Sequence, residues 1–345
     1  MAKNNVLGKL ASQGYSLKRT KEKTRVFICG LGNIGCGYDL DLESSGVVLT
    51  HAKAFSQVED FELVGGADPC AINRLRFSHR YGRPSFSDLT KGLEEQKPSL
   101  VVLASPTECH LEGVEATVRY ESVRYILCEK PLAWTFGEGN KILDLCEKAG
   151  VRIFVNYMRR SNPVNLRIKH RFFLNQKWIK GFGTYTKGLL HNGSHLLNLL
   201  EFWFGAPESL IPLNQGRPFG KYDRERDFHI RFLDTSFTFH SKFAEDHEDN
   251  SLQIHIPEGI LDYCQGGRVI TWRQLNRNAG IDPKNESETE EIEKIPSGQE
   301  VSQLFVARNL ADELQGVSTT LCTGKQALDT LILSSQILEG YSLCR

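Results

Sequence analysis

Two histidines in the segment GLLHNGSHLLNLLEFWFG, residues 188–205, stand four residues apart and have side chains that could do chemistry. A spacing of four places His191 and His195 on the same side of a helix. Imidazole exchanges protons near neutral pH and is also a common metal ligand. The pair is therefore a candidate for a general base, for a metal site, or for two polar residues at the edge of an apolar core.

The residues between the two histidines disfavour a metal. A zincin-type site has a glutamate directly after its first histidine, and this chain has Asn192 there. Gly193 indicates that a helix begins near this point rather than before it. We therefore expect no metal site. The catalytic and structural alternatives stay open, because the leucines and aromatic residues that follow have the character of a core stripe.

A glycine pattern near the N-terminus predicts a phosphate-binding turn. In VFICGLGNIG, Gly30, Gly32 and Gly35 form G-x-G-x-x-G directly after an apolar run, which suits a tight turn, close approach of a pyrophosphate and close packing of a following helix. The free amides at the start of that helix would face the phosphates. Downstream, Asp68 ends the next apolar run with no adjacent arginine. A carboxylate there would bind the adenosine ribose and repel a 2′-phosphate, which favours NAD over NADP.

The elements that must position these residues alternate in the first half of the chain. Strand-like runs at 25–30, 61–68, 99–107, 124–131 and 151–157 are separated by helical patterns at 50–58, 108–120 and 136–150, which predicts a parallel sheet covered on both faces. After residue 160, segments 227–243 and 251–257 alternate apolar with polar residues, which predicts an antiparallel sheet. We expect an acidic solvated loop at 282–300 and helices at the C-terminal end.

Composition restricts the class of protein. A chain of 345 residues with 40% hydrophobic and 24% charged residues is typical of a globular protein with two domains. Its 42 basic and 42 acidic side chains balance, which disfavours nucleic acid or an anionic membrane as a partner. No apolar run approaches the ~20 residues of a membrane span. The nine cysteines lack paired spacing, which favours a cytoplasmic location.

The glycine loop, together with VVLASPTECH, CEKPLA and a G-x-H helix about 60 residues past the lysine, resembles the Gfo/Idh/MocA family of oxidoreductases. The resemblance extends from about residue 24 to the C-terminal helix. It implies an α/β fold with an N-terminal Rossmann domain at 24–158, after an extension at 1–23. It also implies a C-terminal α/β domain at 159–345 whose large, mostly antiparallel sheet often forms a dimer or tetramer interface.

The resemblance also implies roles for individual residues. Lys130 matches the lysine that holds the substrate oxygen beside the nicotinamide, and His195 matches the histidine of the D-x-G-x-H element. The chain departs from the family where His191 replaces the aspartate of that element and Asn198 replaces a later aspartate. We expect the cofactor to contact Gly30, Gly32, Asn33, Ile34, Gly35, Asp68, Ser105, Pro106, Thr107, His110, Glu129 and Lys130. We expect the substrate to contact Lys130, Arg160, His191, Asn192 and His195.

Together these residues predict an NAD-dependent oxidoreductase that acts on a hydroxyl or keto carbon of a sugar, nucleotide-sugar or cyclitol. Oxidation of a hydroxyl needs a general base with a pKa near neutral, and His195 is the candidate, with Lys130 stabilising the charge on oxygen. His191 would relay the proton or contact the substrate. The alternative is a non-catalytic nucleotide-binding sensor, which the missing aspartates favour.

Overall fold

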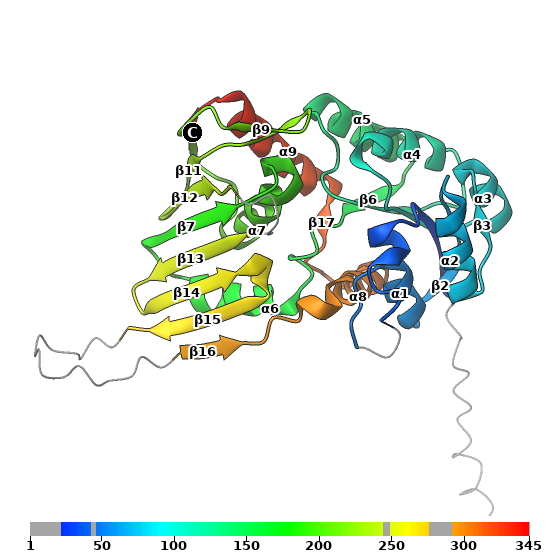
Figure 1. The fold of residues 1–345 in the computed structure, drawn as a ribbon, viewed down its shortest axis with the longest axis horizontal. Coiled ribbons are helices and arrows are strands. Elements are labelled where there is room, and N and C mark those ends of the chain that lie inside the picture. Colours follow the sequence, from blue (N-terminus) through cyan, green and yellow to red (C-terminus); the bar gives the residue numbers. More distant parts are fainter. Residues whose placement is uncertain (1–21, 43–45, 244–248, 276–291, 345) are drawn as a thin grey trace, which may run out of the picture.

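The computed structural model describes residues 22–42, 46–243, 249–275 and 292–344. Two sheets dominate it, and Figure 1 shows them at the two ends of the molecule with helices between and around them. The expected extension at 1–23 lies almost wholly outside the described residues. The fold is the expected combination of a Rossmann-type sheet and a second, mostly antiparallel sheet.

The first sheet has the strand order β17-β6-β5-β4-β1-β2-β3. Apart from β17, its strands are parallel and follow the order of a dinucleotide-binding fold, with the reversal between β1 and β4. Its centre is fully apolar, since Val26, Phe27 and Ile28 have no exposed surface. The strands are β1 (Thr24–Cys29), β2 (Phe61–Ala67), β3 (Ser85–Phe86), β4 (Leu100–Leu103), β5 (Tyr125–Cys128), β6 (Arg152–Val155) and β17 (Cys322–Thr323).

Helices cover both faces of this sheet, because strands without a polar face must be buried on both sides. One face carries α1 (His51–Gln57), α2 (Ala71–Tyr81) and α8 (Ser302–Leu314). The other carries α3 (Leu89–Gln96), α4 (His110–Thr117), α5 (Phe136–Lys148) and α9 (Gly324–Glu339). The sequence patterns predicted α1, α4 and α5, whereas the short β3 and the polar helices α2 and α3 were missed.

The second sheet has nine strands in the order β16-β15-β14-β13-β7-β12-β11-β8-β18, and β12 pairs in parallel with β7. Helices α6 (Pro163–Ile168) and α7 (Ser194–Phe204) lie on the side that faces the first sheet (Figure 1). The strands are β7 (Ile179–Tyr185), β8 (Ser209–Pro212), β11 (Phe228–Phe232), β12 (Thr235–Ser241), β13 (Ser251–Ile256), β14 (Gly259–Cys264), β15 (Val269–Gln274), β16 (Ile292–Ile295) and β18 (Leu343–Cys344). A separate hairpin joins β9 (Arg217–Phe219) and β10 (Asp223–Glu225).

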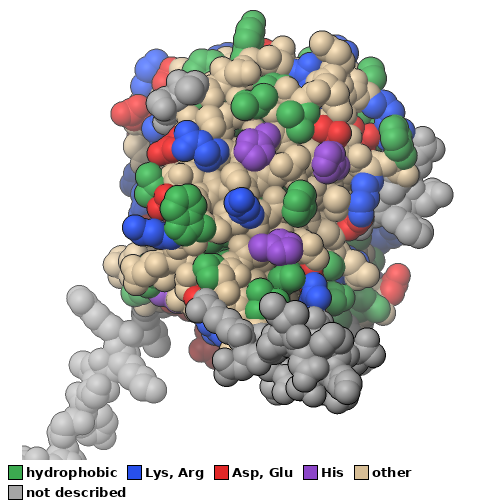
Figure 2. Space-filling view, turned by 90° about the vertical axis from the view of Figure 1, so that its left-hand side faces the viewer, with side chains coloured by type: hydrophobic (Ala, Val, Ile, Leu, Met, Phe, Trp, Pro, Cys, Tyr) green, Lys and Arg blue, Asp and Glu red, His purple; other side chains and the backbone are tan. Residues whose placement is uncertain are grey.

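No helix of the described residues covers the outer face of this sheet, and Figure 2 shows histidine, charged and apolar side chains scattered over it. The cause is alternation along the strands. In β7, Ile179, Gly181 and Gly183 are buried, while Lys180 and Phe182 are exposed. One sheet face therefore packs on a core and the other is polar with isolated apolar residues.

The end of the chain returns to the first sheet. β17 pairs with β6, and Val306 and Leu310 of α8 belong to the same apolar cluster as the strands of the first sheet. β17 and α8 come from the range 159–345 but pack on the first sheet, which a single domain boundary between residues 158 and 159 does not describe. The expectation of a solvated loop at 282–300 was wrong for 292–295, which form β16 at a sheet edge, while 276–291 lie outside the described residues.

Candidate active site

The glycine loop has the geometry of a cofactor cradle. Gly30 has φ +97°, and a Cβ on it would lie 2.6 Å from the carbonyl carbon of Ala104. A Cβ on Gly35 would lie 2.0 Å from the carbonyl oxygen of Gly30. In contrast, a Cβ on Gly32 would have nothing within 4 Å. The loop therefore presses against the end of β4 and leaves open space over Gly32, where a pyrophosphate could approach the backbone.

An insertion separates the glycine loop from the helix expected at 50–58, so no regular α-helix follows the loop directly. Residues Asn33–Gly37, including Ile34, form one π-helical turn, and α1 starts fourteen residues later at His51. Glycines at 35 and 37 disfavour a regular helix. The carboxylate of Asp39 organises the insertion, because it accepts hydrogen bonds from Leu49 N at 2.7 Å and from Thr50 N at 3.0 Å.

Asp68 lies beside the glycine loop, as expected for a ribose ligand. It is 7% exposed, and its carboxylate accepts bonds from Leu31 N at 2.8 Å, Cys70 N at 2.7 Å and Asn73 Nδ2 at 3.2 Å. No arginine is adjacent to Asp68 along the sequence, but one lies next to it in space. Arg74 Nη1 donates to the carbonyl oxygen of Asp68 at 2.8 Å, because the first turn of α2 brings it back toward the end of β2.

The loop after β4 carries Ser105, Pro106 and Thr107 at the same edge of the sheet. Ser105 Oγ is buried without a hydrogen-bond partner among the described residues, as suits an atom that contacts a bound cofactor. His110 cannot make the expected contact, because it is fully buried. Its Nδ1 and Nε2 lie 3.2 Å from Leu132 O and 3.1 Å from Ser105 O, so it positions the two loops.

Glu129 is tied to residues that the sequence motifs did not indicate. His51 Nε2 lies 2.8 Å from its Oε1, and Asn156 Nδ2 donates to the same oxygen at 2.6 Å. Burial alone would raise the pKa of Glu129, but the bonds from His51 and Asn156 hold that pKa below its usual value. Glu129 therefore stays ionised and fixes the turn that presents Lys130.

Lys130 joins the first domain to the histidine segment. Its Nζ donates to the carbonyl oxygen of His191 at 2.7 Å. His191 belongs to a π-helical turn, Leu189–Gly193, and its side chain is exposed, whereas His195 begins α7 and is 7% exposed. The two rings therefore do not form one exposed face of a single helix, although both lie close to Lys130.

His195 has the environment of a base that stays neutral. Its Nδ1 is buried without a partner among the described residues, and its ring meets the Tyr157 ring edge-on at 5.7 Å. Burial, and after it the charges of Arg159 and Lys130, lower the pKa of His195 well below its ordinary value. Asn192 is 5% exposed, and its Nδ2 has no partner among the described residues.

Arg160 is not where the expected substrate contact requires it. Its Nη1 donates to Gln326 Oε1 at 2.6 Å, and it lines a separate hollow with Glu201, whose pKa burial raises to about 7. The preceding residue, Arg159, is the one whose charge acts on His195. The match to the family motif could not distinguish these two arginines, because they stand side by side in the sequence.

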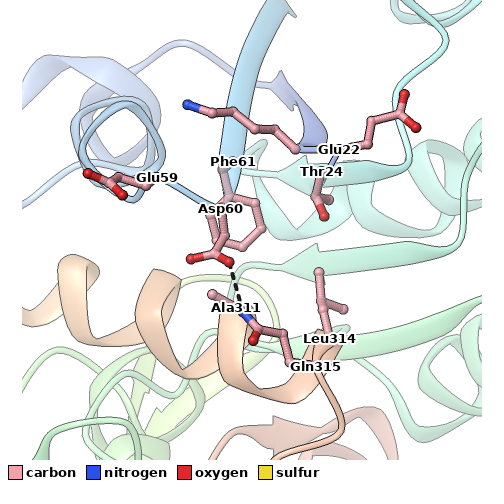
Figure 3. A pocket seen from close by; sticks show the side chains of 9 residues that line it. Glu22, Thr24, Glu59, Asp60, Phe61, Ala311, Leu314 and Gln315 are labelled. Carbon is pink, nitrogen blue, oxygen red and sulfur yellow. Dashed lines mark hydrogen bonds between the residues drawn. The ribbon is translucent and has the colours of Figure 1, made fainter. Parts of the chain in front are cut away.

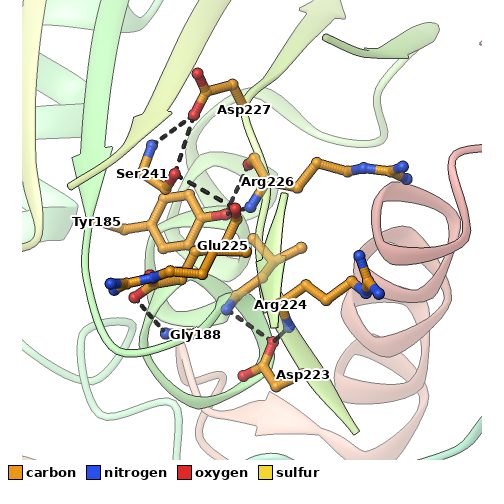
Figure 4. Close-up of polar contacts among 10 residues, drawn as sticks. Tyr185, Gly188, Asp223, Arg224, Glu225, Arg226, Asp227 and Ser241 are labelled. Atoms are coloured by element: carbon orange, nitrogen blue, oxygen red, sulfur yellow. Dashed lines mark hydrogen bonds and ion pairs between the residues drawn. The ribbon is translucent and has the colours of Figure 1, made fainter. Parts of the chain in front are cut away.

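Asp223, which Figure 4 draws next to Arg224 of the same strand, holds the histidine segment and was also missed. Its carboxylate accepts bonds from the backbone amides of Leu189, Leu190 and His191 at 2.9, 3.0 and 2.9 Å. Gly188 has φ +84°, and a Cβ there would lie 2.1 Å from Asp223 Oδ2. Asp223 comes from strand β10, so no local sequence pattern could have linked it to residues 32 to 34 positions earlier.

Another hollow, lined by Glu22, Asp60, Phe61 and Gln315, lies where β1 and β2 begin (Figure 3). The glycine loop follows the opposite ends of these parallel strands, so this hollow is not part of the cofactor site. Across the described residues, no group of three or more histidine, cysteine or acidic side chains could hold a metal ion. Nor is any helix within the described ranges long and apolar enough to cross a membrane.

Residues 24–157 match the family model GFO_IDH_MocA, an oxidoreductase family with an NAD-binding Rossmann fold. The N-terminal domain belongs to the Gfo/Idh/MocA oxidoreductase family. The match assigns a nicotinamide cofactor, NAD, to the domain, in agreement with the glycine loop, the open space over Gly32 and the unpartnered Ser105 Oγ.

Curated relatives match about a third of this chain. Glucose-6-phosphate 3-dehydrogenase of Bacillus subtilis is 29% identical over 131 residues, which are 38% of this chain and 34% of the relative. Rhizopine catabolism protein MocA of Rhizobium meliloti is 29% identical over 113 residues, 33% and 35% of the two chains. The match thus spans about a third of each relative's length.

Solved structures extend the likeness of the fold to both domains. The WlbA dehydrogenase of Bordetella pertussis, crystallised with NADH and UDP-GlcNAcA, has a TM-score of 0.70 at 18% identity and covers 94% of this chain and 98% of its own. Levoglucosan dehydrogenase, crystallised with NADH and L-sorbose, has a TM-score of 0.72 at 15% identity and covers 93% and 98%.

Proposed function

We propose that this chain is an NAD-dependent oxidoreductase that transfers a hydride between nicotinamide and a hydroxyl or keto carbon of a sugar, nucleotide-sugar or cyclitol. The observation that carries the proposal is the meeting of Lys130 with the histidine segment, at 2.7 Å between Nζ and His191 O, next to the buried His195. A positioned cation and a neutral base are the two groups that alcohol oxidation requires.

NAD, when bound, supplies the acceptor for a hydride from the carbinol carbon. His195 takes the hydroxyl proton as the carbonyl forms, and in the reverse direction it returns that proton. Lys130 donates a hydrogen bond to the oxygen on which charge develops, and stabilises the transition state more than the ground state. Lys130 keeps this position because Glu129 and the His191 carbonyl fix it on two sides.

His191 fits a substrate contact better than a proton relay. Its ring is exposed, whereas the ring of His195 is buried. Its backbone, rather than its ring, takes part in the described bonds to Asp223 and Lys130. We propose that the ring reads the substrate, and that Asn192 supplies a further donor.

The cofactor preference follows from Asp68. Its buried carboxylate favours NAD over NADP, because a 2′-phosphate would meet a negative charge. Arg74 is already bound to the carbonyl oxygens of Asp68 and Pro69, at 2.8 and 2.9 Å, and would weaken this repulsion. We expect NAD(H) to bind at least about tenfold more tightly than NADP(H), about 1.4 kcal/mol. Calorimetric titration of both cofactors measures this, and equal affinities would remove Asp68 from the ribose contact.

A panel of sugars, cyclitols and nucleotide-sugars with NAD tests the activity itself. Production of NADH with at least one of these supports the proposal. A second candidate, a non-catalytic nucleotide sensor, is favoured by Asn198, which stands where the family has an aspartate and whose Nδ2 bonds to Thr330 Oγ1 at 2.9 Å. Tight NAD(H) binding without hydride transfer to or from any member of the panel would favour the sensor. We also propose a cytoplasmic location, supported by eight free thiols among the described residues.

A further inference from the structure

An aromatic-walled cavity of about 460 Å³ lies next to the candidate active site. Glu108 and Trp134 line it from the first domain. Phe219, Lys221 and Tyr222 line it from the turn of the β9–β10 hairpin, and His191 closes it from the histidine segment. Its volume is within the range of about 300–1,000 Å³ in which proteins enclose small molecules.

The cavity continues the site beyond the reacting groups. His191 is common to both, since its carbonyl oxygen accepts the bond from Lys130 Nζ and its side chain lines the cavity. Lys130 and His195 themselves are not among the described residues that line it. A ligand held here would therefore be the part of a substrate that does not react.

Aromatic side chains form part of the cavity wall. The rings of Trp134 and Tyr222 are nearly parallel, at 22°, with centroids 5.9 Å apart, which leaves too little room for a third ring between them. Tyr222 is nevertheless 47% exposed, and Lys221 Nζ lies over its ring, 4.7 Å from the centroid. The Phe219 and His191 rings, which also line the cavity, lie 6.5 Å apart. Such faces accept a ring with one apolar side and polar edges.

We propose that this cavity binds a second, neutral sugar ring of a glycosidic substrate. The C–H face of a pyranose packs on the aromatic part of the wall, and its hydroxyl edge reaches Glu108, His191 and Lys221. This inference rests on the proposed oxidoreductase activity, and it names the substrate class more narrowly as a disaccharide or larger glycoside rather than a free monosaccharide.

Two observations favour a neutral sugar over the base and phosphates of a nucleotide-sugar. A nucleobase has two flat faces and is best held between two aromatic rings. Trp134 and Tyr222, with centroids 5.9 Å apart, do not leave room for it. A diphosphate calls for several cations. The charged side chains that line the cavity are of both signs, with Glu108 and the buried Asp223 beside Lys221.

The aromatic part of the wall is rigid enough for recognition, because the hairpin is anchored on the residue after Tyr222. Asp223 binds the histidine segment through three backbone amides, and Glu225 Oε2 accepts Arg217 Nε at 2.8 Å across the hairpin (Figure 4). Specificity from preorganised contacts of this kind needs little ordering when the ligand binds.

Steady-state kinetics with NAD tests the proposal. Neutral hexoses are compared with disaccharides that carry the same reacting hexose, such as glucose with maltose and cellobiose, and galactose with lactose. The proposal expects kcat/KM to be at least about tenfold higher for one or more disaccharides than for its monosaccharide. Tyr222→Ala and Trp134→Ala should each lower kcat/KM for the disaccharide at least about fivefold more than for the monosaccharide. Tyr341→Ala and Trp178→Ala, at positions 63% and 73% exposed, are the matched controls.

Equal kcat/KM values for mono- and disaccharides, or equal losses for both in Tyr222→Ala, would overturn the second-ring subsite. A preference for nucleotide-sugars that Tyr222→Ala abolishes would overturn it in favour of a base. If no sugar is turned over, calorimetry of the NADH-bound protein with the disaccharides separates the two proposals. Binding that Tyr222→Ala weakens keeps the subsite while the oxidoreductase proposal fails, and no binding ends both.

Discussion

At the scale of single residues, the state of His195 depends on its surroundings more than on its position in a motif. Burial and the charges of Arg159 and Lys130 lower its pKa from the ordinary 6.5. His110, buried between two carbonyl groups, has a lowered pKa for the same first reason. This pKa differs from the near-neutral value expected for the base: the ring is neutral at physiological pH and can accept a proton, but it is a weaker base than an ordinary histidine.

This environment predicts the pH dependence. In the oxidation direction, kcat of the wild-type protein should stay level from pH 8 to 6.5 and fall at lower pH, where His195 takes up a proton. The free energy of unfolding changes with pH in the same direction as kcat. Because the native pKa lies below the unfolded one, the unfolded state binds the proton first, and the free energy of unfolding falls as the pH drops below about 6.5, by up to about 1.4 kcal/mol per pH unit for each histidine.

His195→Gln tests both effects. It should nearly abolish turnover, and it should reduce the loss of stability between pH 6.5 and 5 while His110 still contributes its share. Chemical denaturation across this pH range measures the second effect. A variant with near wild-type turnover would return His195 to the structural interpretation, as a polar residue at the edge of the core.

At the scale of elements, the site is made where a π-helical turn from one part of the chain meets a hairpin from another. Asp223 on β10 binds the Leu189–Gly193 turn. Within that turn, the carbonyl oxygen of His191 accepts a hydrogen bond from Lys130. The family's aspartate is missing from this segment, and the segment's carboxylate contact comes from a different strand. Asp223 is therefore a positioning residue.

Asp223→Asn should lower kcat about tenfold or more with a smaller change in NAD(H) affinity. The asparagine NH2 group that replaces Oδ2 cannot accept the hydrogen bond from the His191 amide, so the His191 carbonyl is no longer held in place for Lys130. It should also lower the stability by about 2 kcal/mol. Asp227→Asn is the matched control. Asp227 caps Ser241 on the neighbouring strand, at 2.8 Å from the Ser241 amide, and does not contact the turn (Figure 4). Equal kinetic effects of the two variants would mean that Asp223 acts through general stability.

At the scale of the whole molecule, the sequence predicted those features that repeat locally. Apolar runs between amphipathic helices were enough to predict the parallel first sheet. Alternation of apolar with polar residues was enough to predict the antiparallel second sheet. The glycine loop, Asp68 and Lys130 lie at strand ends, where a parallel sheet gathers ligand-binding residues, and the structure brings them to one edge. The family resemblance indicated His195 as the base, which the spacing alone left undecided, and this role stays a proposal.

The missed features depend on contacts between distant segments. His51 and Asn156 bind Glu129 across 78 and 27 residues, and Arg74 reaches Asp68 through a helix turn that no motif encodes. Arg160, which the family resemblance indicated as a substrate contact, binds Gln326 across 166 residues. Helices α2 and α3 were missed because their sequences are polar and have few buried residues.

The outer face of the second sheet, which no helix of the described residues covers, predicts self-association. Phe182 is 55% exposed on β7, the central strand of the nine, and the residues paired with it on the neighbouring strands are Thr238 and Gln253. We expect a homodimer or homotetramer through this face, and Phe182→Lys should shift the mass measured by light scattering toward the monomer. Leu75→Lys, at a 65% exposed position of α2, is the control. A wild-type protein that is monomeric at high concentration would contradict the expectation.

The central claim is that Lys130 and the histidine segment form a hydride-transfer site, and Lys130→Ala tests it most directly. Single-turnover and steady-state rates with NAD and the best sugar of the panel should fall about a hundredfold or more, because the lysine stabilises charge in the transition state. NAD(H) affinity should barely change, and Lys180→Ala, on the outer face of the second sheet, should behave as wild type. Undiminished turnover in Lys130→Ala, with or without a loss of NAD binding, would contradict the account.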